Sequence, residues 1–255
     1  MITKTVLDEL VIKYENKDFI KDDPIQFPHK YTNKQDIELV GFIASLFAYG
    51  NRLVFIKKLE ELFDYMGKSP VDYIRNSDFN EIIKNDFNYR FSKSEDIKEL
   101  FKILQKLYSS SSIHELFEYG YDKSKNIIKM QECVVDYFYG NASTKASHGF
   151  YHLLPNPRKQ GAMKRMNMFL RWMIRKSDVD LGIWEFIPKS ELLMPIDVHV
   201  SRISREMKLL TRKINDIKAV IELTNNLKRF DKYDPVKYDF AIYGKGIEEI
   251  RIKEH

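Results

Sequence analysis

Apolar residues recur every three to four positions along most of the chain, which is the period of an amphipathic helix. The clearest case is residues 37–47, which are apolar nearly all round, so this helix is expected at the centre of a bundle. Thr32 or Asn33 can cap its start, and Gly50 and Asn51 supply a backbone geometry that ends it. The spacing predicts further helices over residues 3–16, 53–66, 71–74, 94–108, 113–117, 126–138, 162–173, 216–229 and 235–243.

No stretch shows the sustained alternation of apolar and polar residues that is typical of a half-buried strand. Glycine and proline are scarce, at 10 and 8 residues, which argues against a turn-rich β fold. The sequence therefore predicts an all-α protein, a compact helical bundle that forms a single domain over residues 1–255. Within it we expect two helical lobes with a cleft between them, residues 35–140 and residues 1–34 together with 150–255.

The single cysteine, Cys133, excludes an intramolecular disulfide, a four-cysteine zinc site and a protein-ligated iron–sulfur cluster. No metal and no other cofactor is expected. The first residues include acidic side chains and no long apolar core, which is untypical of signal and transit peptides. No apolar run approaches the roughly 18 residues that a membrane span needs, so we expect a cytoplasmic protein without a membrane partner.

The net charge of +5 is modest, but basic residues concentrate between positions 156 and 176, where no residue is acidic. Such a stretch is either a solvated helix face or a surface that meets phosphates. The basic residues of this stretch are Arg158, Lys159, Lys164, Arg165, Arg171, Arg175 and Lys176.

Lys164 is the strongest candidate for chemistry in the basic stretch. It falls in the first turn of a predicted helix, directly after residues 155–161, a turn whose backbone N–H groups can bind phosphate. The positive end of the helix, the neighbouring Arg165 and any burial all disfavour a positive charge on this amine, as a nucleophile requires. The alternative is one more lysine that faces phosphate or solvent.

Asp197 follows an apolar run and precedes apolar residues at helical spacing, so it is expected at the N-terminus of a helix. There it would act as an N-cap and accept N–H bonds from residues two or three further on. Capping holds the side chain rigidly, and the second oxygen can still face a cleft. His199 is expected to support this site or to pack in the core, since no companion metal ligands share its spacing. Asp239 can point at the same cleft or pair with a lysine.

Four segments, in sequence order, resemble the helix-hairpin-helix (HhH-GPD) DNA glycosylases of the endonuclease III superfamily. Residues 194–202, Met-Pro-Ile-Asp-Val-His-Val-Ser-Arg, look like that family's Asp-Thr-His-Val-x-Arg segment. Residues 164–170, Lys-Arg-Met-Asn-Met-Phe-Leu, are similar to its Lys-Thr-Ala-Asn-Val-Val-Leu. Residues 38–50 resemble the long central helix and the Ser-Ala-Gln loop that probes DNA, and residues 240–246 resemble a Leu-Ile-Leu-His-Gly-Arg helix end. The whole is most like a bacterial branch of the superfamily, with some likeness to archaeal 8-oxoguanine DNA glycosylase.

The resemblance implies a DNA-repair enzyme, a glycosylase and AP lyase that acts on a damaged base flipped out of the stack. The family's lysine is a Schiff-base nucleophile, a role that falls on Lys164 here. Asp197 would stabilise positive charge on the sugar or help to deprotonate the lysine, and His199 and Asn167 would support the pair. The implied partner is double-stranded DNA with a damaged or abasic site, bound by a monomer. The implied DNA contacts are Tyr49, in the place of the residue that fills the vacated stack, and Asn51, Arg52, Arg158, Lys159 and Arg165.

Two departures from the family keep other hypotheses open. Residues 155–164 lack the Gly-x-Gly of the family's Leu-Pro-Gly-Val-Gly-Arg-Lys hairpin, and the iron–sulfur cysteines of endonuclease III are absent. One alternative is a nucleic-acid-binding protein that retains the glycosylase fold without turnover. Another is a helical interaction protein whose basic stretch is a solvated face. Tyr49 can also be a half-buried tyrosine of the bundle.

Overall fold

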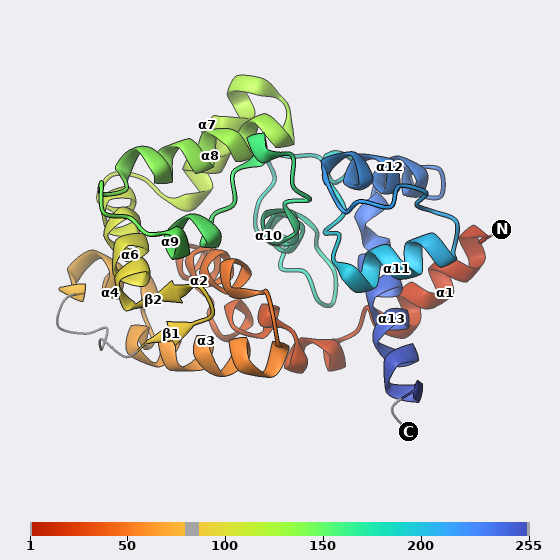
Figure 1. Cartoon of the computed structure of the whole chain (residues 1–255), viewed down its shortest axis with the longest axis horizontal. Helices are drawn as coiled ribbons and strands as arrows, with labels where there is room; N and C mark the ends of the chain where they lie inside the picture. The colour runs from red at the N-terminus through yellow and green to blue at the C-terminus, as the bar shows by residue number, and fades with distance from the viewer. Residues whose placement is uncertain (1, 80–86, 254–255) are drawn as a thin grey trace. The chain divides into compact units, whose positions relative to one another are not determined.

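The computed structural model describes residues 2–79 and 87–253, and nearly all elements of this part of the chain are helices (Figure 1). The sheet that it contains is one short antiparallel pair, β1 (Asn88–Tyr89) with β2 (Ser92–Lys93). The all-α prediction is therefore confirmed. None of the helices described is both long enough and apolar enough to traverse a lipid bilayer. The chain divides into two compact units, which we call unit 1 (residues 1–23 and 159–255) and unit 2 (residues 24–158).

Unit 2 is built around α2 (Lys34–Phe47), the helix predicted to be central. The Asn33 side chain caps it by accepting a hydrogen bond of 2.8 Å from the Gln35 N–H. Every residue from Asp36 to Phe47 is buried, which confirms the central position. The helix packs against neighbours that include α3 (Arg52–Met66), α4 (Pro70–Asn76) and α7 (Ile113–Ser124). The unit also contains η2 (Pro24–Gln26), η3 (Pro28–Lys30), α6 (Ser94–Tyr108), α8 (Ile127–Asn141) and α9 (His148–Leu153).

The buried carboxylate of Asp96 links the β1–β2 hairpin to the start of α9 through hydrogen bonds. It accepts hydrogen bonds from the Lys93 N–H at 2.8 Å, the Ser147 hydroxyl at 2.6 Å and the Phe150 N–H at 3.1 Å. A Cβ on Gly149 would lie 2.2 Å from the carbonyl oxygen at the hairpin turn, so only glycine permits this approach. The hairpin is consequently rigidly placed relative to α9.

Unit 1 joins the two ends of the chain, because α13 (Asp239–Lys253) packs against α1 (Lys4–Tyr14) and α11 (Val198–Glu206) (Figure 1). The predicted end of the last helix at Gly244 is wrong. A Cβ on Gly244 would lie 2.4 Å from Cγ of Tyr14, and one on Gly246 would lie 3.2 Å from Cγ1 of Ile203. These glycines let neighbouring helices approach closely, and α13 continues through both. The unit also contains η1 (Lys17–Asp22), α10 (Lys164–Ile174), η5 (Lys189–Glu191), α12 (Ile217–Lys228) and η6 (Pro235–Tyr238), and η4 (Pro157–Lys159) lies where the chain leaves unit 2.

Candidate functional site

Lys164 is the first residue of α10 and is half-buried, as expected for a side chain at the start of this helix. Two hydrogen bonds hold the turn that precedes it. The Gln160 carbonyl accepts from the Ile217 N–H at 3.0 Å, and the Asn167 side-chain amide donates to the Ala162 carbonyl at 3.2 Å. Asn167 is only 1% exposed, so its side chain holds the turn before Lys164 from the interior of the unit. This is the contact through which Asn167 can support the lysine.

The same turn has an unusual backbone. Gln160 and Met163 both adopt left-handed conformations, with φ of 60° and 49°. Gln160 stands four positions before Lys164, where the hairpin motif of the endonuclease III superfamily has its first glycine, and a left-handed non-glycine residue costs about 1–2 kcal/mol. Gly161 forms an isolated antiparallel bridge with Asp216, and a Cβ on Gly161 would meet nothing within 4 Å. The turn therefore contains two left-handed residues that are not glycine, and its backbone at Gly161 faces open space.

Asp197 is the N-cap of α11, as predicted. Its Oδ1 accepts hydrogen bonds from the His199 N–H at 2.9 Å and the Val200 N–H at 2.8 Å. Its Oδ2 makes no hydrogen bond with the residues that the structure describes, and the side chain is half-buried. The His199 ring packs edge-on against Tyr243 of α13, with 6.1 Å between ring centroids. His199 thus braces the start of α11 against α13 while Asp197 keeps one oxygen for another partner.

A third charged residue, Asp239, lies in the same unit as the two predicted catalytic residues. It opens α13, is 6% exposed, and accepts a hydrogen bond from Nη1 of Arg171, which lies two turns after Lys164 on α10. Burial raises the pKa of the Asp239 carboxyl to about 7; the Asp197 charge also raises it, whereas the Arg171 and Lys164 charges lower it. The carboxyl therefore senses both Lys164 and Asp197, and side chains from α10, α11 and α13 share one electrostatic neighbourhood within unit 1.

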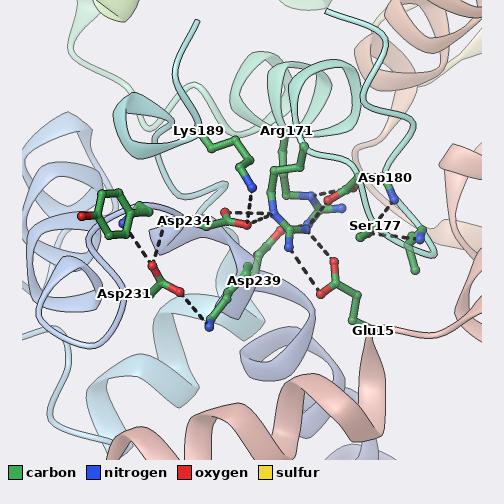
Figure 2. Close-up of polar contacts among 12 residues, drawn as sticks. Glu15, Arg171, Ser177, Asp180, Lys189, Asp231, Asp234 and Asp239 are labelled. Carbon is green, nitrogen blue, oxygen red and sulfur yellow. Dashed lines mark hydrogen bonds and ion pairs between the residues drawn. The ribbon is translucent and has the colours of Figure 1, made fainter. Parts of the chain in front are cut away.

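Beyond Asp239, the charged side chains alternate in sign through the interior of unit 1 (Figure 2). Arg171 Nε donates to Asp180 at 3.2 Å, and Arg175 donates to the other oxygen of Asp180. Arg175 also donates to both oxygens of Asp234 at 3.0 Å and to Glu15 at 2.5 Å. We call Glu15, Arg171, Arg175, Asp180, Asp234 and Asp239 the buried charge network; none of their side chains is more than 14% exposed.

The basic stretch is therefore not one surface. Arg165, Arg171 and Arg175 are 9%, 3% and 4% exposed, so their guanidinium groups lie in the interior. This corrects both interpretations of the stretch, the solvated face and the phosphate surface, for these three residues. Arg171 and Arg175 neutralise buried carboxylates. Arg165, an expected DNA contact, is not presented to solvent, and its burial argues against a phosphate contact there.

Tyr49 lies in unit 2 and is half-buried. Its ring centroid is 4.9 Å from that of Tyr89 and 4.7 Å from that of His152. Its hydroxyl is 3.4 Å from Oγ of Ser92, and the Tyr89 hydroxyl donates to its carbonyl. The ring is packed among aromatic neighbours and also partly exposed, which suits either of the two interpretations of this residue.

The other expected DNA contacts differ in their exposure and in the hydrogen bonds that their side chains make. Asn51 is the N-cap of α3 and accepts a backbone hydrogen bond of 3.2 Å. Arg158 donates two hydrogen bonds, of 2.6 and 2.8 Å, to Asp136 and is 49% exposed. Arg52 is half-buried at the start of α3, and Lys159 is exposed.

The pairing of Asp239 with Arg171 was not predicted. A signal for it exists in the sequence, because Arg171 lies between Leu170 and Trp172 on a helix that is apolar on most sides. A charged residue in such a position is almost always paired with a buried partner. Among the described residues, no group of three or more histidine, cysteine, aspartate or glutamate side chains is arranged to hold a metal ion.

The family model described as protein of unknown function (DUF2400) matches residues 23–248, and the chain belongs to this family. The matched range includes Lys164, Asp197 and Asp239 and leaves out α1. No curated protein and no solved structure shows significant similarity to the chain.

Proposed function

We propose that this member of the DUF2400 family is a DNA glycosylase with AP-lyase activity, acting on a damaged or abasic site in double-stranded DNA. The observation that carries the proposal is that Lys164 opens α10 half-buried while the N-cap Asp197 leaves Oδ2 without a hydrogen bond among the described residues, both within unit 1. A nucleophile and a charge-stabilising carboxylate must converge on one sugar carbon, and these two residues come from different helices of the same unit. The resemblance to the endonuclease III superfamily assigns the same two roles to the same two residues.

In the proposed reaction the neutral Lys164 amine attacks C1′ of the deoxyribose. The new C1′–N bond forms as the glycosidic bond breaks, and the electron pair leaves with the base, which takes up a proton. Transfer of one amine proton to O4′, as the C1′–O4′ bond opens, gives a protonated Schiff base and a hydroxyl at C4′. Removal of a proton from C2′ then expels the phosphate oxygen at C3′ and cleaves the strand.

Asp197 would stabilise the positive charge that develops on the sugar, because a carboxylate fixed in position needs no reorganisation as the charge forms. Its Oδ1 is committed to the His199 and Val200 N–H groups. Oδ2 is therefore the oxygen assigned to the sugar. Lys159, exposed beside the turn, would contribute a phosphate contact, while Arg165 is left out of the phosphate-binding set because it is buried.

Trapping with borohydride tests the proposal, because reduction converts a Schiff base into a stable covalent adduct. Wild-type protein should form an adduct with duplex DNA that contains an abasic site, and Lys164→Ala should form none. Asp197→Asn should lose adduct formation while it keeps the helix cap, since asparagine caps as well as aspartate. Lys213→Ala, which removes an exposed lysine of unit 1 that has no assigned DNA contact, serves as the control and should still be trapped. Absence of a wild-type adduct on every lesion tried, abasic sites included, would refute the proposal.

A nucleic-acid-binding protein without turnover is the second candidate. The observation that favours it is the turn before Lys164. Gln160 stands there where the hairpin of the endonuclease III superfamily has its first glycine, and it has a left-handed conformation. This candidate predicts salt-dependent binding of DNA or RNA that survives Lys164→Ala, with no adduct from either protein.

A further inference from the structure

An aromatic row runs over unit 2, separate from the residues assigned to catalysis. Phe91 lies in the turn of the β1–β2 hairpin and is 49% exposed. Its ring centroid is 4.7 Å from that of His152 on α9, and the His152 centroid is 4.7 Å from that of Tyr49, in the segment after α2. Three rings from three separate parts of the sequence thus lie in contact.

We propose that this row of Tyr49, His152 and Phe91 is a stacking site for an unpaired base of DNA, with Phe91 as its exposed face. The proposal rests on the proposed function only in its choice of DNA as the ligand. Base flipping leaves a base without its partner, and aromatic side chains bind such bases because every base has a π-face. The resemblance implies this role for Tyr49 alone, and the structure adds Phe91 and His152 to it.

The row is preformed, which lowers the entropy cost of binding. The close approach of Gly149 to the Phe91 carbonyl sets α9 against the hairpin turn. The Asp96 carboxylate then bonds residues on both elements, at Lys93 on the hairpin and at Phe150 on α9. Phe91 is therefore exposed on a rigid support, so its ring is available without a rearrangement of the hairpin.

The charge beside the row suits a nucleic acid. Arg90 is exposed, and its guanidinium carbon lies 5.9 Å from the Phe91 ring centroid. A Cβ on Gly50 would lie 2.8 Å from Nη1 of Arg90, so the arginine extends across the backbone next to Tyr49. An exposed cation next to stacked rings matches the combination that binds single-stranded segments.

A duplex with a tetrahydrofuran abasic analogue opposite 2-aminopurine tests the site without catalysis, because this analogue has no base to release and cannot form a Schiff base. Wild-type protein should bind it and change the 2-aminopurine emission. Phe91→Ala should bind roughly tenfold more weakly, since stacking on an aromatic side chain contributes about 1–3 kcal/mol per base and 1.4 kcal/mol is tenfold. Phe91→Trp should bind like wild type. Phe91→Leu, apolar but without a π-face, should be as weak as Phe91→Ala.

Tyr119→Ala is the matched control. Tyr119 is another exposed aromatic of unit 2, at 53%, with the Lys123 amine 4.2 Å from its ring centroid. Its removal should leave affinity and emission unchanged. Circular dichroism and thermal melts establish that each variant is folded.

Several outcomes would overturn the stacking site. The first is that Phe91→Ala binds the duplex as tightly as wild type, and the second is that wild-type protein does not bind the duplex at all. The third is that Phe91→Leu binds as tightly as wild type, because an apolar contact of the kind made with a protein partner would then be sufficient. Borohydride trapping on a true abasic site is read separately. Phe91-dependent binding without any adduct would remove the proposed catalysis and keep the stacking site, whereas adduct formation with no effect of Phe91→Ala on binding would do the reverse.

Discussion

Replacing Arg175 with methionine should destabilise the protein by about 3–5 kcal/mol, the usual loss when one partner of a buried ion pair is removed. Arg175 is 4% exposed and donates to Asp180, Asp234 and Glu15. Methionine is long and flexible enough to fill much of the vacated space. The loss would therefore come mainly from three buried carboxylates that no longer share a cation.

The matched control is Arg158→Met. Arg158 also makes a two-pronged pair, with Asp136, but the two side chains are 49% and 55% exposed. An exposed pair contributes about 0–1 kcal/mol, because solvent screens it. At about 2–4 °C of Tm per kcal/mol for a chain of this size, Arg175→Met should lower Tm by roughly 6–20 °C and Arg158→Met by less than about 4 °C.

Urea unfolding followed by circular dichroism, at neutral pH and in mildly acidic buffer, measures both effects. Burial raises the pKa of Asp180, and the neighbouring Arg171 and Arg175 charges counteract that rise. Without Arg175 this carboxyl should take up a proton more readily, so the loss in Arg175→Met should shrink as the pH falls. Equal losses in the two variants, or a loss in Arg175→Met that does not change with pH, would show that the network is not what stabilises unit 1.

Three further predictions concern single positions. Burial raises the folded-state pKa of Asp239 to about 7, from an ordinary value of about 4 in the unfolded chain, so the folded protein holds a proton that the unfolded chain has released. Stability should therefore fall as the pH rises between these two values, and Asp239→Asn should flatten that slope in thermal melts. Gly244→Ala should lower the free energy of unfolding in urea by about 1–3 kcal/mol, because the new Cβ would lie 2.4 Å from Tyr14. Gly140→Ala, on α8 with nothing within 4 Å of the new Cβ, should raise it by about 0.5–1 kcal/mol, and a rise at both positions would contradict the packing argument. Asp197→Ala should lower the free energy of unfolding by about 1 kcal/mol through loss of the cap, and Asp197→Asn should leave it almost unchanged. If both variants lose borohydride trapping equally, the capping role of Asp197 is separated from its proposed catalytic role.

Local patterns predicted the parts of the fold that depend on neighbours in sequence. The apolar residues of α2 and the Asn33 cap lie within a few positions of one another, and so do Asp197 and the N–H groups that it binds. Helix periodicity and capping are governed by such short separations. The first turn of α10, with Lys164 at its start, was predictable for the same reason.

Packing between distant segments was not predictable in this way. Gly244 resembles a helix terminator in the sequence, and only contact with Tyr14 shows that it serves close packing. The basic stretch resembled a surface because two of its counter-charges, Glu15 and Asp234, lie far away in sequence, although Asp180 follows Arg175 by only five positions. Phe91 lies outside every helix that the sequence predicts, and its row with His152 and Tyr49 depends on how α9 meets the hairpin.

The closure of unit 1 by both chain ends has a consequence for synthesis. The Tyr14 hydroxyl donates to Glu248, 234 positions later, and α1 packs on α13. At ~5–20 residues per second the ribosome needs roughly 10–50 s to supply the second partner after the first. During that interval unit 2, which is continuous over residues 24–158, can complete its own contacts, while Leu7 on α1 has no helix to bury it. A nascent chain stalled before α13 should therefore carry a folded insert between the two unjoined portions of unit 1.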